Sequence, residues 1–262
     1  MQFDEIRVSA AQGSDFVIPE SWCQGRTVYG GLSAALLCDA VSKGIGQDRR
    51  LRYLNISFLK PLEANKPFRL NMEEVSAGRT VTVRSGQIVQ DGVTRVAAQA
   101  NFVAKLDSQF EVETFTPPSL KSWDAEGVKG IRGSNVPAYT QFIDFRFATE
   151  GLPFQGTGVT ELGGWMRFNE APETMSECHL VCLIDAWPPV PVSYYERVVP
   201  LSTINWEIVF VESVDGVDGN QFLGYMARLN FFRDGYGSST ADIWTPDGRC
   251  LAKSQQTFVI YG

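Results

Sequence analysis

The 262-residue sequence lacks several features that would assign its class at once. It has one histidine and five cysteines, and no apolar run approaches the roughly 18 to 20 residues needed to span a bilayer. Its first residues, Met1–Glu5, do not show the basic-then-apolar pattern of a signal peptide, so we expect a cytoplasmic protein with no membrane partner. An odd number of cysteines in apolar surroundings predicts reduced, buried thiols rather than a disulfide framework.

Basic charge is also scarce. A net charge of −7 argues against a nucleic-acid partner, because phosphate binding draws its affinity from concentrated lysine and arginine. A polyanionic ligand such as coenzyme A needs only a local basic patch. The segment Arg49–Arg52 could supply one, although its position favours a solvated loop before a strand.

Because His179 is the only histidine in the sequence, few histidine-dependent catalytic or metal sites are possible. No Gly-x-Ser-x-Gly motif is present, so a Ser-His-Asp hydrolase of the α/β type is disfavoured. Cys178, His179 and Cys182 share helical spacing, but three weak ligands without a fourth do not make a zinc site. We therefore expect neither a metal nor a redox cofactor.

The sequence does contain an internal repeat. When Asp91-Gly92 is aligned with Asp247-Gly248, the residues that follow match without a gap. Both stretches predict a β-hairpin, because an Asp-Gly turn with positive φ angles separates runs rich in β-branched and aromatic residues. Leu37–Ala40 matches Leu183–Ala186 at nearly the same distance ahead of each strand block. The chain therefore holds two copies of one unit.

Each copy predicts one helix and several strands. The first helix begins at Gly30 and Gly31 and ends before Gly44, where a C-terminal stop belongs. The second covers about 174–187 and is stopped by Pro188, since proline cannot continue a helix. The predicted strands are 53–60, 68–75, 80–90 and 93–105 in the first copy, and 142–148, 161–169, 202–212, 222–233, 238–245 and 249–261 in the second.

These elements predict an α+β fold of two similar halves. The N-terminal unit covers residues 1–106 and the C-terminal unit 141–262, and a connector at 107–140 lacks the apolar spacing of a core element. The two strand blocks could pair edge to edge into one long sheet that carries both helices on its concave face.

Three short motifs follow one another along the chain: Val28–Gly31, Phe142–Arg146 and Gly164–Phe168. In order and spacing they resemble the type II acyl-CoA thioesterases, and the resemblance covers nearly the whole chain. The first is similar to the start of that family's first central helix, the second to the first strand of its second half, and the third to its Trp-x-Arg strand. The resemblance implies a double hotdog, in which two tandem antiparallel units each wrap a central helix. It also implies an acyl-CoA substrate, and a homo-oligomer, because hotdog sheets commonly pair.

In that family an aspartate at the end of the second helix, a threonine that opens the next strand and a glutamine on the final strand hold the hydrolytic water. Asp185, Thr203 and Gln256 match these positions. The chain departs from the family in two places: the segment after Asp185 is shorter and richer in proline, and Asn205-Trp206 replaces an acidic residue and a histidine.

The chemistry of the three residues suits thioester hydrolysis, which needs a carboxylate to activate water and donors that face the oxyanion. Judged from the residues alone, Asp185 could instead face solvent or cap a helix, and Thr203 is equally an ordinary strand residue. Only one of Gln255 and Gln256 can face the helices, and the repeat pairs Gln256 with the small Ala100, which favours Gln256.

The two glycines at the start of the first predicted helix allow two interpretations. Gly30 and Gly31 either leave backbone amides free to polarise a bound thioester or allow close helix–sheet packing. Asp39, the repeat counterpart of Asp185, is interpreted as a relic or a structural group. The sequence predicts hydrolysis of acyl-CoA to free acid and coenzyme A, and the alternative is a non-catalytic acyl-CoA-binding protein with the same fold.

Overall fold

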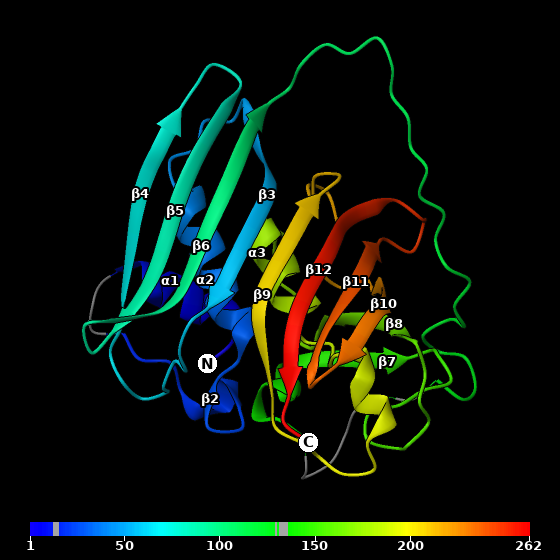
Figure 1. Cartoon of the computed structure of the whole chain (residues 1–262). Helices are drawn as coiled ribbons and strands as arrows, with labels where there is room; N and C mark the ends of the chain where they lie inside the picture. Colours follow the sequence, from blue (N-terminus) through cyan, green and yellow to red (C-terminus); the bar gives the residue numbers. More distant parts are fainter. Residues whose placement is uncertain (13–15, 129, 131–135) are drawn as a thin grey trace.

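The computed structural model describes residues 1–12, 16–128, 130 and 136–262. Its centre is a ten-stranded antiparallel sheet with the order β4-β5-β6-β3-β9-β12-β11-β10-β8-β7 (Figure 1). The strands are β3 (Arg49–Phe58), β4 (Arg69–Ala77), β5 (Val81–Gln90), β6 (Val93–Ala104), β7 (Ile143–Phe147), β8 (Glu161–Phe168), β9 (Leu201–Phe210), β10 (Leu223–Arg233), β11 (Tyr236–Trp244) and β12 (Cys250–Ile260), with the short pair β1 (Cys23–Gln24) and β2 (Thr27–Val28) outside the main sheet.

Three α-helices lie on one face of this sheet (Figure 1). They are α1 (Phe3–Gln12), α2 (Gly30–Ser42) and α3 (Glu177–Ile184), and three short 3₁₀-helices cover Glu20–Trp22, Ala138–Phe142 and Val190–Tyr194. The central helices α2 and α3 pack against each other. The predicted α+β fold, with one long sheet behind both helices, is confirmed.

The two halves of the sheet join where β3 pairs with β9 over Tyr53–Ser57. Side chains alternate along both strands, so Leu54 and Ile56 on β3 and their partners Ile208 and Trp206 on β9 are fully buried against the helices. Because these residues fill one continuous core, the halves form a single packed body.

Helix ends differ in detail from the sequence prediction. The helix α3 is shorter than predicted: Ser176 forms its N-cap in a capping box with His179, and Asp185 is its C-cap. Gly44 follows the end of α2 at φ +70°, as a C-terminal stop requires. Both residues of the Asp91-Gly92 turn have positive φ, whereas in the second hairpin only Gly248 does.

The helix α1 was not predicted. Phe3 and Ile6 bury its inner face, and two polar contacts tie it to the central helices. The imidazole Nε2 of His179 lies 3.1 Å from Asp4 Oδ1, and the guanidinium of Arg7 donates to Asp39 Oδ1 at 3.0 Å. Asp39 therefore has a structural partner on α1.

The basic segment Arg49–Arg52 is not a loop, because it forms the first part of β3. The Arg49 guanidinium donates to the Gly78 carbonyl and the Thr82 hydroxyl. The Arg52 guanidinium donates to the carbonyls of Phe210 and Val211, at 2.6 and 2.9 Å. These two arginines therefore stabilise the fold through hydrogen bonds and do not form an exposed cationic patch.

Arg52→Met is expected to lower the free energy of unfolding by about 1.5 to 3 kcal/mol, the range for hydrogen bonds that involve a charged group. The substitution leaves two carbonyls at the end of β9 without their donor. Arg50→Met is the matched control, because Arg50 is exposed on the same strand. Chemical denaturation of both variants measures the difference, and equal midpoints would contradict this role for Arg52.

Candidate active site

Four of the sequence-predicted residues, Gly30, Gly31, Asp185 and Gln256, meet where the C-terminus of α3 reaches the N-terminus of α2. The N-cap residue of α2, Tyr29, makes no side-chain cap, so the first amides of the helix depend on other partners. Asp185 lies opposite, and the backbone N–H of Gly31 interacts with its carboxylate. A methyl group at Gly30 would lie 2.8 Å from Asp185 Oδ2, so the close approach of the carboxylate requires glycine at that position.

Gln256 completes this contact from β12. Its Nε2 donates to Asp185 Oδ1 at 2.7 Å, while Gln255 is exposed. The inward face predicted for Gln256 is therefore observed. Its register partner on β9 is the buried Trp206.

Thr203 lies nearby on β9 but is not bonded to the pair. It pairs with Phe258, two residues beyond Gln256 on β12, after a bulge between Thr257 and Phe258. Register partners share one face of a sheet, so Thr203 lies on the same side as the buried Phe258. Among the described residues, no hydrogen bond joins its hydroxyl to Asp185 or Gln256.

The environment of Asp185 changes its acidity. Burial raises the pKa of this carboxyl to about 7, against the smaller opposing effects of the Gln256 hydrogen bond and the Gly31 amide. Asp185 therefore exchanges a proton near neutral pH, where a general base is most effective.

Two tyrosines that sequence reasoning missed hold the segment around Asp185. The Tyr29 hydroxyl donates to the Cys182 carbonyl at 2.6 Å, and the Tyr139 hydroxyl donates to the Ala186 carbonyl at 3.0 Å. Their rings stack with centroids 3.9 Å apart. The last carbonyls of a helix lack intrahelical partners, and the Tyr29 hydroxyl supplies one for Cys182 in the last turn of α3. The Tyr139 hydroxyl bonds to the residue that follows Asp185, so the two tyrosines hold the chain on both sides of this carboxylate.

A second aromatic pair extends from the segment after Asp185. The ring of Trp187 stacks on Tyr225, with centroids 4.9 Å apart, and its Nε1 donates to Met166 Sδ. Burial, and then the charge of Asp185, raises the pKa of Tyr225, so its hydroxyl stays protonated. Tyr225 is an aromatic residue in the strand β10, which looks like ordinary core, and nothing in the sequence pattern marks its ring as a neighbour of Asp185.

Comparison with known proteins assigns the family. Residues 18–103 match the model of the acyl-CoA thioesterase N-terminal domain, and residues 113–260 match that of the acyl-CoA thioesterase C-terminal domain. The chain belongs to the acyl-CoA thioesterase family. No curated protein matches the sequence.

Solved structures share the fold. A protein of unknown function with a hot dog fold from Alicyclobacillus acidocaldarius is 21% identical, with a TM-score of 0.81, over 96% of this chain and 94% of that one. A tesB protein from Mycobacterium avium subs paratuberculosis is 14% identical, with a TM-score of 0.79, over the whole of both chains. A putative thioesterase II from Thermobifida fusca is 16% identical, with a TM-score of 0.77, over 99% and 97%. The fold is a double hotdog, as the resemblance implied.

None of the helices in the described ranges combines the length and the apolar composition that a bilayer crossing requires.

Gly30→Ala is expected to lower the rate of any reaction that uses Asp185 by at least tenfold, because the added methyl displaces the carboxylate from Gln256 and α2. Gly46→Ala is the control, since its added methyl would meet only the carboxylate of the exposed Asp48. Thiol release from acyl-CoA, measured beside a thermal melt of each variant, tests the expectation. Full activity in Gly30→Ala would show that the carboxylate needs no such close approach.

Proposed function

We propose that this protein hydrolyses acyl-CoA thioesters to a free carboxylic acid and coenzyme A, with Asp185 as the general base. The observation that carries the proposal is the hydrogen-bonded pair of Asp185 and Gln256 at the start of α2, in which burial brings the pKa of the carboxyl to about 7. Family membership supports the substrate class.

In the proposed reaction, one water lies between Asp185, Gln256 and Thr203. The amide nitrogen of Gln256 is already bonded to Asp185, so its carbonyl oxygen is the atom that accepts a hydrogen bond from the water. The Thr203 hydroxyl, which is not bonded to either side chain, offers a further contact. These partners orient the water, and Asp185 removes one of its protons as the oxygen attacks the thioester carbonyl carbon.

Attack forms a tetrahedral intermediate that carries a negative oxygen. Because the Gly31 amide interacts with Asp185, the role of donor to this oxygen falls to the Gly30 N–H, assisted by the positive end of α2. This revises the expectation that both glycine amides are free for the substrate. The intermediate then collapses, the C–S bond breaks, and the departing thiolate of coenzyme A takes the proton from Asp185.

Asp185→Asn is expected to lower kcat by about 10² to 10⁴, the usual contribution of a positioned general base. The carboxamide keeps the shape of the side chain but cannot take a proton from water. Asp39→Asn is the matched control, because Asp39 occupies the equivalent position in the first half and contacts Arg7 and Lys43. Release of free thiol from a panel of acyl-CoA substrates measures both variants.

Two outcomes of that assay would reject the proposal. One is unchanged activity in Asp185→Asn. The other is a wild-type protein that binds acyl-CoA but releases no thiol, which would identify a binding protein with this fold.

The pH dependence follows from the raised pKa of Asp185. The reaction needs the ionised carboxylate, so kcat is expected to be constant above about pH 8 and to fall about tenfold per pH unit well below the pKa of about 7. A carboxylate of ordinary acidity would instead keep full activity down to pH 5. A kcat profile between pH 5 and 9, with stability checked at each pH, separates the two.

A further inference from the structure

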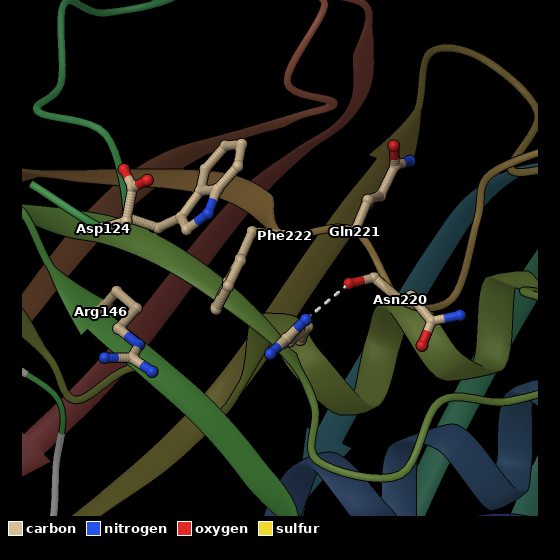
Figure 2. Close-up of a pocket in the computed structure, with 7 residues that line it drawn as sticks. Asp124, Arg146, Asn220, Gln221 and Phe222 are labelled. Carbon is tan, nitrogen blue, oxygen red and sulfur yellow. Dashed lines mark hydrogen bonds between the residues drawn. The ribbon is translucent and has the colours of Figure 1, made fainter.

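A polar pocket lies on the outer face of the sheet, at the end formed by β7 and β8 (Figure 2). Its volume is about 320 Å³. The side chains that form it come from the edge strand β7, its neighbour β8, the connector and the loop before β10, and those used below are Asp124, Arg146, Arg167, Asn220 and Phe222. Two of them belong to the strand motifs Phe142–Arg146 and Gly164–Phe168, which the proposed reaction does not use.

Both arginines of the pocket are held in place by neighbours. Asp144 accepts from Arg146 Nη2 at 3.0 Å and forms a longer ion pair, of 3.7 Å, with Arg167. The ring of Phe222 lies under both guanidiniums, 4.3 Å from that of Arg167 and 5.9 Å from that of Arg146. One carboxylate and one aromatic face therefore orient two cations before any ligand arrives.

The two guanidiniums keep donors that the fold does not use. Arg167 Nη1 donates to the Asn220 carbonyl at 2.9 Å, but within the described ranges Arg167 Nη2 and Arg146 Nη1 make no hydrogen bond. The carboxylate of Asp124 points away from Arg146 in Figure 2 and accepts from the Ser122 hydroxyl. By contrast, the guanidiniums of Arg49 and Arg52 donate hydrogen bonds to backbone carbonyls.

One edge strand connects this pocket to the candidate active site. Phe145 and Phe147, on either side of Arg146, point to the opposite face of β7 and pack edge-on against Trp187. Trp187 follows Asp185 by two residues. β7 is the edge strand of the sheet, and its inward rings link the pocket to the segment that carries Asp185.

We propose that this pocket binds a phosphate group at the nucleotide end of coenzyme A. The inference rests on the proposed function, since acyl-CoA carries phosphates at the end of the molecule remote from its thioester. Of the two carboxylates at the pocket, Asp144 lies between the guanidiniums and Asp124 is turned away from Arg146. The guanidinium N–H groups that the fold leaves unused match the several oxygens of a phosphate.

The first experiment uses the wild-type protein. KM and kcat are measured for one acyl group carried by coenzyme A, by 3′-dephospho-coenzyme A and by pantetheine. We expect KM to be at least about tenfold lower for acyl-CoA than for acyl-pantetheine, with similar kcat, and the dephospho substrate shows whether the 3′-phosphate or the diphosphate is bound. Equal KM values for acyl-CoA and acyl-pantetheine would overturn the proposal.

The second experiment places the effect in this pocket. Arg146→Gln with Arg167→Gln is expected to raise KM for acyl-CoA about tenfold and to leave both kcat and the KM for acyl-pantetheine unchanged. Arg228→Gln is the matched control, because Arg228 also projects from the sheet but is paired with Glu161 and Asp242 outside the pocket. An equal rise in KM for both substrates would indicate a structural effect and contradict the phosphate site.

Direct binding separates this inference from the hydrolytic proposal. Adenosine 3′,5′-bisphosphate is titrated calorimetrically into wild-type protein, Asp185→Asn and the double arginine variant, with a thermal melt of each. We expect binding to wild type and to Asp185→Asn, and loss of at least tenfold in affinity in the double variant. Absence of binding to the wild type overturns the site whatever the thiol assay shows, whereas binding without thiol release defeats only the hydrolytic proposal.

Discussion

The packing at the centre of this protein depends on a carboxylate that is buried between the ends of two helices. Asp185 ends α3 and faces the uncapped start of α2, where burial raises its pKa to about 7. Such a group is tolerated only if hydrogen bonds replace the water it loses. The Gln256 amide and the start of α2 supply them, and their geometry requires glycine at position 30. The acidity of one side chain thus depends on residues from both halves of the chain.

The continuous sheet makes that arrangement possible. Because β3 pairs with β9 and β12 lies directly beyond, a side chain of the last strand reaches the helix junction at the middle of the molecule. The stacked rings of Tyr29 and Tyr139 then bond to carbonyls on both sides of Asp185. The carboxylate of Asp185 is thus positioned by the sheet, by the two central helices and by the tyrosines.

Much of this was predictable from local pattern and from the repeat. The Asp-Gly hairpins, the buried helix after Gly30 and the inward face of Gln256 each follow from periodicity or from comparison of the two copies. The helix α1 escaped prediction because its few apolar residues give a weak pattern, and Arg49–Arg52 was misread because partners in distant segments satisfy charges that look exposed in the sequence. The tyrosine contacts could not be predicted, since hydroxyl–carbonyl bonds between remote segments leave no periodic signature.

The docking of α1 has a consequence for the internal symmetry of the chain. The match of Asp39 with Asp185 sets Ser176 opposite Gly30, so the repeat predicts a second, equivalent junction where α3 begins and α2 ends. There Ser176 and His179 cap their own helix, and Arg7 neutralises Asp39 while α1 covers the ends. The duplicated architecture therefore offers two equivalent positions for an acid, and the N-terminal helix makes them unequal: it pairs Asp39 with a cation and leaves Asp185 to the Gln256 amide and the start of α2.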